Sequence, residues 1–284
     1  MLKDLLKKSF SGILIICITA IFSSLVYSTI MENEQQKCWD TFTETGQMIS
    51  SKLSILMEHN INTLKLAAAT ISNSNTVYSR EEVIRYVNKL QDTTIFTRID
   101  LLYPDNSLLL LQSGKTLTEG HSLSFADLAS QEQHISQRIL DLETQRQVVH
   151  YYLPVEKNGQ ISHILVGVID CASLAEHFYS AAYDNQTTCC VVDSRDGNFI
   201  VSGEYTFWGN LYEMLPEKQL EGYEDIALKQ EVKAQKTGIA AYAYNQGQEQ
   251  ALIYYTPLNF FDWQLLIIAP EKVVFSNLHE MKSI

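Results

Sequence analysis

The sequence has no run of basic residues beyond its first few positions. It contains 21 Lys and Arg against 33 Asp and Glu, and its formal net charge is -12 at pH 7. Binding to nucleic-acid phosphates depends on clustered Lys and Arg side chains. The charge balance therefore argues against a nucleic-acid surface, and we expect no nucleic-acid partner.

The sequence also lacks the short motifs of common catalytic and metal sites. It has no His or Cys pair at the HExxH or Cys-x-x-Cys spacing and no Gly-x-Ser-x-Gly motif. The stretch DSRDGN at 193–198 lacks the alternating ligands and the terminal Glu of a calcium loop, so it predicts a hairpin turn at Asp196-Gly197. We assign no catalytic residue, no metal ligand and no cofactor.

Cysteine is scarce, and the spacing of the cysteines does not indicate a disulfide framework. One of the five Cys residues, Cys17, lies in an apolar stretch, and Cys189 and Cys190 are adjacent. Neighbouring residues of a strand face opposite sides, so at most one of this pair points into a given core. We expect buried cysteines that act as small apolar residues.

A charge-free stretch near the N-terminus is the strongest local signal that is present. No charged residue lies between Lys8 and Glu32, and about twenty apolar residues suffice to cross a bilayer. The pattern predicts a membrane-spanning helix at 9–31. The alternative is a cleaved signal peptide, but its apolar region is usually roughly 7 to 15 residues long and ends at a small-x-small site, which is not clear here.

The charges on the two sides of this stretch predict its orientation. Lys3, Lys7 and Lys8 precede it, whereas Glu32 and Glu34 follow it. By the positive-inside rule, the N-terminus lies in the cytoplasm. We therefore expect a cell-membrane protein with residues 32–284 outside the cytoplasm.

A long helix should follow the anchor. Side chains recur at steps of three, four or seven along one face: Phe42, Ile49, Leu53, Leu56, Asn60, Leu64, Ala67 and Ile71. The opposite face is polar, with Glu44, Lys52, Glu58 and Asn62. A helix over 33–72 would be about 60 Å long at 1.5 Å per residue. This length favours a stalk and a homodimer formed through it; an ordinary core helix is the alternative.

The rest of the chain predicts two similar units. EEVIRYVNKL at 81–90 is a short amphipathic helix, and short apolar runs follow, separated by turn residues. YPDNS at 103–107 and Asn158-Gly159 flank a polar, helix-prone stretch at about 114–146. Asp196-Gly197 and Gln246-Gly247 flank predicted helices at about 208–236, a similar spacing of about 50 residues. Trp208 and Trp263 are predicted core residues.

Several longer runs resemble one known family. VVHYYLPVEKNGQISHILVGVIDCASLAEHF is similar to a strand pair and helix of the double Cache sensor domain. CCVVDSRDGNFIVSGEYTFWGNLYEML and GIAAYAYNQGQEQALIYYTPLNFFDWQLLIIAPEKVV resemble its membrane-proximal module. The resemblance covers about residue 33 to the end and implies an α+β fold with two tandem PAS-like modules built on antiparallel sheets.

The resemblance implies the sensor region of a bacterial transmembrane receptor. A second membrane span and a cytoplasmic output domain would follow residue 284. The stretches VVDSRDGNF and GNLYEML resemble the sequences of sensor domains that precede diguanylate cyclases and histidine kinases. Whether the whole protein is an enzyme stays open. The expected parts are a cytoplasmic N-terminus (1–8), an anchor (9–31), a stalk helix (32–75), a membrane-distal module (76–180), a membrane-proximal module (181–270) and a helix returning to the membrane (271–284).

Asp170 is the first candidate for contact with a small-molecule ligand. It ends the strand ILVGVID and shares a face with Ile164, Val166 and Val168, where a carboxylate needs a partner. In related sensors for amino acids or amines, the Asp at this strand end binds the ligand's ammonium group, which the resemblance implies for Asp170. The alternative is a helix cap, although Ser173-x-x-Glu176 offers a capping box of its own.

One feature of the family's amino-acid pattern is missing. That pattern includes an Arg-x-Trp-Tyr run before the third strand, and no Trp or Tyr lies between residues 112 and 146. A small metabolite other than an α-amino acid is therefore favoured, and its identity stays open.

Strand parity supplies the other candidate ligand-binding residues. Phe96, Arg98, Asp100 and Leu102 share one face of their strand, so Arg98 is placed to hold a ligand carboxylate. A solvated ion pair between Arg98 and Asp100 is the alternative. On the strand VVHYYLPV the pocket face carries either Val149, Tyr151 and Leu153 or Val148, His150 and Tyr152.

Three functions remain open at this stage. The first is a small-molecule sensor that passes binding to an output domain, and a chemoreceptor sensor region is a variant of it. The second class is a membrane-anchored adhesin or assembly protein that takes no small ligand. An extracellular hydrolase is disfavoured because the nucleophile and metal motifs are missing.

Overall fold

In the computed structural model of the chain, the described residues are 2–73, 80–91, 93–131, 134–141, 143–177, 186–202, 209–215, 223, 226–244 and 249–276. Trp208, most of the turn at Gln246-Gly247 and residues 277–284 of the expected returning helix lie outside them, as does the side chain of Ile71. Among these residues, no helix combines the length and the apolar character that crossing a membrane requires.

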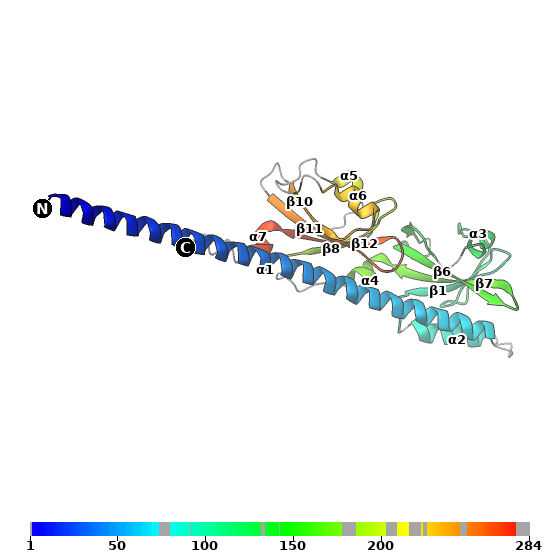
Figure 1. Cartoon of the computed structure of the whole chain (residues 1–284). Helices are drawn as coiled ribbons and strands as arrows, with labels where there is room; N and C mark the ends of the chain where they lie inside the picture. Colours follow the sequence, from blue (N-terminus) through cyan, green and yellow to red (C-terminus); the bar gives the residue numbers. More distant parts are fainter. Residues whose placement is uncertain are drawn as a thin grey trace.

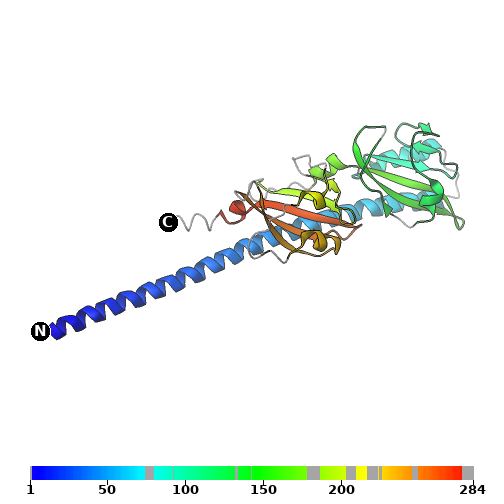
Figure 2. The same cartoon turned by 90° about the horizontal axis from the view of Figure 1, so that it is seen from above.

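One long helix runs beside two antiparallel sheets. Helix α1 spans Leu2–Asn73, and its N-terminal part projects away from the rest of the molecule (Figures 1 and 2). Its buried face includes Phe42, Ile49, Leu53, Met57 and Leu64, at helical steps of seven, four, four and seven. The predicted stalk helix is therefore present, with Met57 rather than the half-buried Leu56 at the centre of the buried face.

The first sheet lies at the C-terminal end of α1. Its strands run in the order β3-β2-β1-β7-β6-β4, and β5 also pairs with β6. The bounds are β1 Arg98–Leu102, β2 Leu108–Leu110, β3 Thr116–Leu117, β4 His134–Ile135, β5 Ile139–Leu140, β6 Gln147–Lys157 and β7 Gln160–Asp170. Helices α2 (Arg80–Gln91), α3 (Phe125–Ala129) and α4 (Cys171–Glu176) accompany it.

The second sheet packs beside the middle of α1. Its strand order is β10-β11-β12-β8-β9. The bounds are β8 Thr188–Asp193, β9 Phe199–Val201, β10 Gly238–Tyr244, β11 Glu249–Pro257 and β12 Trp263–Pro270. Three short helices belong to this part: α5 (Leu211–Met214), α6 (Leu228–Lys233) and α7 (Glu271–Val274).

The two faces of the first sheet have different partners. Tyr151, Leu165 and Ile169 join Leu53 and Leu64 of α1 in one continuous core. The residues between them in sequence, such as Tyr152, Val166 and Val168, form a separate cluster on the other face. This alternation follows from the two-residue period of a strand, and it leaves the second face free of α1.

The predicted turns join the strands as expected. Asn158 and Gly159, between β6 and β7, have φ values of 55° and 79°, the left-handed conformation that a two-residue hairpin requires. Gly197, between β8 and β9, has φ 81°. A Cβ at Gly197 would also lie 2.5 Å from the Tyr212 ring, so this turn accepts no larger residue without movement.

The stretch at 114–146 is not mainly helical as predicted. Among its described residues, only α3, Phe125–Ala129, is an α-helix, and β3, β4 and β5 are two-residue strands on the first sheet. Phe125, Leu128, Ile135 and Ile139 have helical spacing, but the structure divides them between α3, β4 and β5, so pairing with the sheet overrides the local helical pattern.

The second sheet has apolar residues on both faces. Cys189 belongs to the core against α1 and Cys190 to the cluster on the other face, as strand alternation predicts. Trp263 is fully buried, which confirms it as a core residue. Cys38, Cys171, Cys189 and Cys190 are free thiols.

Candidate functional site

The candidate site lies on the face of the first sheet that points away from α1. Arg98 of β1 and His150 of β6 both pair with Val168 of β7, and Asp170 pairs with Val148. Directly paired residues project to the same face of a sheet. The register therefore places five predicted residues on one face: Arg98, Asp100, His150, Tyr152 and Asp170.

Arg98 is the centre of a buried ion-pair cluster. Its Nε donates to Asp100 at 2.7 Å, and Nη1 and Nη2 donate to the two carboxylate oxygens of Asp141 at 3.0 Å each. Arg98 is 7% and Asp100 1% exposed. The ion pair between Arg98 and Asp100 that was the alternative is therefore present, but it is buried rather than solvated.

The two carboxylates of this cluster have pKa values shifted in opposite directions. Burial raises the pKa of Asp100 to about 7, against the attraction of Arg98. Burial also acts to raise the pKa of Asp141, but hydrogen bonds from Arg98 and Thr144 outweigh it and lower the pKa to about 2. Thr144 donates to Asp141 Oδ2 from its amide at 3.0 Å and from its hydroxyl at 2.7 Å.

His150 and Tyr152 form the next part of this face. The two side chains meet at 3.3 Å between His150 Nδ1 and the Tyr152 hydroxyl. Burial, assisted by the positive charge of Arg98, lowers the pKa of His150 to about 4, so its ring is neutral at pH 7. The His150 amide also donates to Ser136 Oγ at 2.9 Å, which ties β6 to the segment after β4.

Asp170 has two roles at the end of β7. Its Oδ1 accepts from the amides of Ala172 and Ser173 at 2.8 and 3.1 Å, so it is the N-cap of α4. Its Oδ2 accepts from Arg146 Nη1 at 2.9 Å. The Asp170 side chain is 3% exposed and that of Arg146 66% exposed. The capping alternative is thus confirmed for Oδ1. The partner of Oδ2 is the long, exposed side chain of Arg146.

These groups border a pocket of 380 Å³, which we call the polar pocket. The volume lies within the range of small-ligand sites, roughly 300–1,000 Å³. Its walls come from β1, β2, β6, β7 and the turn before β6: Thr97, Arg98, Leu110, Gln112, Ser113, Glu143, Thr144, Arg146, Val148, Val168 and Asp170.

The structure separates Tyr151 from the other predicted residues. Tyr151 lies on the α1-facing side of the sheet, where its ring stacks 6.4 Å from that of Phe96. Asp100, His150 and Tyr152 share the face of the polar pocket without being among its lining residues. Of the six candidates, Arg98 and Asp170 line it directly.

Three further residues complete the site and were not predicted. Asp141, Thr144 and Arg146 lie in the stretch expected to be helical, so no strand parity was applied to them. Arg146 directly precedes β6, and its position before the predicted strand is the one sequence signal that could have indicated it. Among the described residues, no group of three or more His, Cys, Asp or Glu is arranged to hold a metal ion.

No protein-family model and no curated protein sequence matches the chain. Solved structures do. The extracellular domain of mmHK1S-Z3, described as a histidine kinase, aligns with a TM-score of 0.61 and 13% identity over 84% of this chain and 97% of that one. The ligand-binding domain of Pseudomonas aeruginosa PAO1 amino-acid chemoreceptor PctB, in complex with L-Arg, has a TM-score of 0.60 and 12% identity over 84% and 97%.

A third similar structure is the ligand-binding domain of Campylobacter jejuni chemoreceptor Tlp3, in complex with 4-methylisoleucine. Its TM-score is 0.59 and its identity 14%, over 85% of this chain and 94% of that one. Identities this low show a shared fold. The chain therefore has the fold of the extracellular ligand-binding sensor domains of histidine kinases and chemoreceptors, which confirms the resemblance to double Cache sensors.

Proposed function

We propose that this chain is the extracytoplasmic sensing region of a membrane receptor and that the polar pocket binds its small-molecule ligand. The observation that carries the proposal is Asp170. This carboxylate is buried at the wall of a 380 Å³ pocket, and within the described part of the chain one of its oxygens has a single hydrogen-bond partner, the long and exposed Arg146. A ligand cation can replace Arg146 there without disturbing the oxygen that caps α4.

The charges around the pocket favour a cationic ligand. Arg98, Arg146 and Lys115, which pairs with Glu143 at 3.5 Å, are opposed by four carboxyl groups: Asp100, Asp141, Glu143 and Asp170. The paired donors of Arg98 that would hold a ligand carboxylate are already bound to both oxygens of Asp141. A free acid at Arg98 would have to break this buried pair, whereas an ammonium group at Asp170 would add a positive charge to a site with more carboxyl groups than cations.

The similar chemoreceptor domains support an ammonium group on the ligand. They are in complex with L-Arg and with 4-methylisoleucine, and both compounds carry one. For this chain, the occupied Arg98 and the absence of Trp and Tyr between residues 112 and 146 favour a small amine without a carboxylate.

The membrane topology is part of the same proposal. Residues 9–31 carry no charge, and α1 continues from this stretch into the part that packs on both sheets. We propose that this stretch anchors the chain, with 1–8 in the cytoplasm and 32–284 outside, so that the first sheet is distal to the membrane. The output domain would be a histidine kinase or a diguanylate cyclase; a reading frame that stops after codon 284 would contradict it.

We also propose a homodimer formed through α1. Met48, Ile55 and Leu66 are 63%, 68% and 67% exposed on the side of α1 away from the sheets. Met48 and Ile55 are seven residues apart, and Leu66 lies eleven beyond Ile55, the spacing of a heptad seam. A second copy of α1 would cover this stripe.

The experiment is thermal unfolding of the full chain in a mild detergent against primary amines, α-amino acids and organic acids. A ligand at about a hundred times its dissociation constant adds about 2.7 kcal/mol to the stability of the folded state. We expect amines to raise the melting temperature and matched acids to leave it unchanged. Stabilisation by acids alone would overturn the proposed ligand class.

A further inference from the structure

One stretch of chain contacts both the polar pocket and the second sheet. It consists of residues 134–141 and 143–146, which we call the bridging segment. At its C-terminal end, Asp141 holds Arg98 and Arg146 holds Asp170. Its N-terminal end reaches the second sheet, which the pocket itself does not touch.

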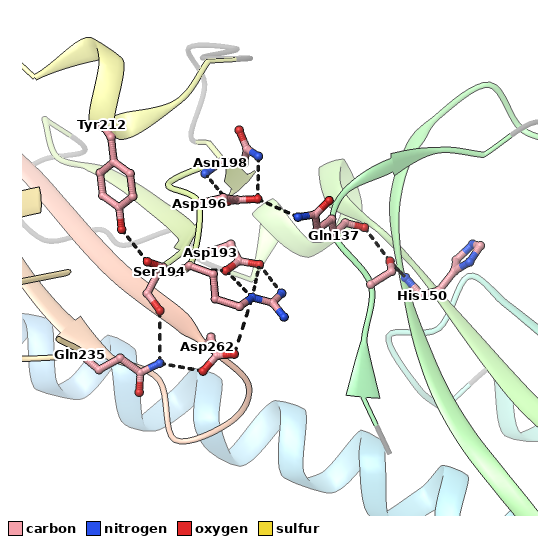
Figure 3. A network of polar contacts seen from close by, with 11 residues as sticks. Gln137, His150, Asp193, Ser194, Asp196, Asn198, Tyr212, Gln235 and Asp262 are labelled. Atoms are coloured by element: carbon pink, nitrogen blue, oxygen red, sulfur yellow. Dashed lines mark hydrogen bonds and ion pairs between the residues drawn. The ribbon is translucent and has the colours of Figure 1, made fainter. Parts of the chain in front are cut away.

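Two neighbouring side chains make the contact with the second sheet. Gln137 Nε2 donates to Asp196 Oδ2 at 3.1 Å, in the turn between β8 and β9 (Figure 3). Arg138 Nη1 donates to the carbonyl oxygen of Phe199 in β9. The two contacts hold both sides of one hairpin turn.

The bridging segment is short and firmly held between these ends. Only Ile139 and Leu140 separate Arg138 from Asp141. The Asp141 amide donates to the Arg146 carbonyl at 2.8 Å, so the backbones of the two residues that hold Arg98 and Asp170 are joined. Ser136 and His150 exchange two hydrogen bonds, of 2.8 and 2.9 Å, which fix Gln137 next to β6.

Helix α4 provides a second connection from the same end of the pocket. Asp170 caps this helix, and Cys171 and Leu174 of α4 belong to the same core as Ile200 and Val201 of β9. The two elements that leave the Asp170 end of the pocket therefore both reach β9.

The turn that receives these contacts is linked onward to the last strand. Within it, Asn198 donates to Asp196 from its amide and its side chain, at 2.8 Å each. The Ser194 amide donates to the carbonyl of Asp262 at 2.7 Å, and Gln235 bridges Ser194 and Asp262 at 3.3 and 3.2 Å (Figure 3). Asp262 immediately precedes β12.

Strand β12 ends at α7, which lies against α1. The Phe275 ring, next to α7, meets the Trp39 ring of α1 edge-on at 5.1 Å between centroids. A continuous series of contacts thus runs from the polar pocket to the part of α1 nearest the proposed membrane anchor.

We propose that the bridging segment transmits occupancy of the polar pocket to the β8–β9 turn, and through Asp262 to β12 and α7, with Gln137 and Arg138 as the coupling residues. This inference rests on the proposed function of the pocket. A ligand cation on Asp170 releases Arg146, the hydrogen-bonded turn from Asp141 to Arg146 shifts, and Gln137 and Arg138 pass the displacement to the turn. Signalling requires such a difference between the empty and the occupied arrangement.

The test is amide hydrogen exchange of the full chain in detergent, with a substitution in place of the unknown ligand. Asp141→Asn weakens the grip of the bridging segment on Arg98. We expect the amides of Asp193, Gly197 and Asn198, all hydrogen-bonded in the turn, to exchange roughly two- to tenfold faster, as the loss of one hydrogen bond's net contribution gives. Thr144→Val, at an exposed position, is the milder variant if Asp141→Asn does not fold.

The double variant Gln137→Ala/Arg138→Ala identifies the route. When Asp141→Asn is added to this double variant, amide exchange in the β8–β9 turn should not become any faster. A double-mutant cycle gives this result when the two sites act through the same contacts. Asp105→Asn is the matched control, because Asp105 accepts from the Ser107 amide and hydroxyl in the β1–β2 turn of the same sheet, outside the bridging segment. It should leave exchange in the β8–β9 turn unchanged.

Three results would overturn the inference: no acceleration in Asp141→Asn and Thr144→Val, equal acceleration in the double-variant background, or equal acceleration by Asp105→Asn. The experiment needs no ligand. A thermal-unfolding screen that finds no ligand therefore does not change the exchange result. If the exchange experiment contradicts transmission through the bridging segment, the binding proposal is still tested by thermal unfolding alone.

Discussion

Arg98 and Asp141 form a bidentate ion pair between β1 and the turn before β6, with both hydrogen bonds at 3.0 Å and both residues buried. Forty-three positions apart in sequence, they join the two sides of the polar pocket. This pair determines what the pocket offers to a ligand, because it occupies the Arg98 guanidinium and leaves Glu143, Arg146 and Asp170 as the other charged side chains of the lining.

Loss of Arg98 should be strongly destabilising. Arg98→Met leaves Asp100 and Asp141 without their cation, and removal of one partner from a buried pair costs about 3–5 kcal/mol. Arg85→Met, the same substitution at an exposed position of α2, should change the unfolding free energy by less than about 0.5 kcal/mol. Chemical denaturation measures both. A similar small effect in the two variants would show that the cluster contributes nothing to the fold.

The buried His150 should make stability depend on pH. Because its pKa is lowered to about 4 in the folded chain, the unfolded chain binds the proton more readily between about pH 6.5 and 4. Its contribution is present above pH 6.5 and is lost as the pH falls through this window, by up to about 3 kcal/mol. Asp100 acts in the opposite sense, since its raised pKa reduces stability as the pH rises towards 7.

Comparison with His150→Gln isolates this effect, because Asp100 and His163 titrate in both proteins. The stability difference between wild type and variant should shift in favour of His150→Gln as the pH falls from 6.5 to 4. Urea denaturation at several pH values measures it. Parallel pH profiles would mean that His150 is as easily protonated in the folded as in the unfolded chain.

The contact of α1 with the second sheet can be tested at Gly46. A Cβ built at this glycine collides with the Tyr254 ring of β11. Gly46→Ala should therefore lose about 1–3 kcal/mol through overpacking, against up to about 1 kcal/mol gained in helix propensity. Ser51→Ala, at an exposed position of α1, is the control and should change little. A net stabilisation in Gly46→Ala would contradict the close packing of α1 on β11.

The homodimer proposal predicts a charge-sensitive stripe on α1. Ile55→Glu places two carboxylates in the proposed seam, and we expect at least about a tenfold weaker dimer in sedimentation of the full chain in detergent. Glu58→Lys, on a neighbouring exposed position, should leave the association constant nearly unchanged. A monomer in the wild type, or unchanged association in Ile55→Glu, would remove the stripe as an interface.

The strands that carry the site could be predicted from the sequence, whereas the segment that covers Arg98 and Asp170 could not. The period of two along a strand places Arg98 and Asp100 on one face of β1 and Asp170 with Val168 on one face of β7, and Asn158-Gly159 predicts the hairpin that pairs β6 with β7. The register that puts these two faces together comes from the structure. Parity alone does not tell which face meets α1. The choice between Tyr151 and Tyr152 therefore depended on tertiary packing.

Asp141, Thr144 and Arg146 were not predictable for a different reason. They lie in a stretch whose strands are two residues long, too short to show any period. Their positions are set by Arg98 and Asp170, partners distant in sequence. The segment that contains Asp141 also helps to bury Arg98 and Asp100. From their two-residue separation in sequence alone, Arg98 and Asp100 resemble an ordinary surface ion pair.

The most direct test of the account is calorimetric titration of the full chain with the primary amine that gives the largest thermal shift. It compares the wild type with Asp170→Asn, which keeps an oxygen able to cap α4, and with Arg146→Ala, which removes the competing cation. We predict opposite changes: loss of detectable binding in Asp170→Asn and tighter binding in Arg146→Ala. Undiminished binding in Asp170→Asn, or weaker binding in Arg146→Ala, would contradict the proposal that Asp170 receives the ligand's ammonium group in place of Arg146.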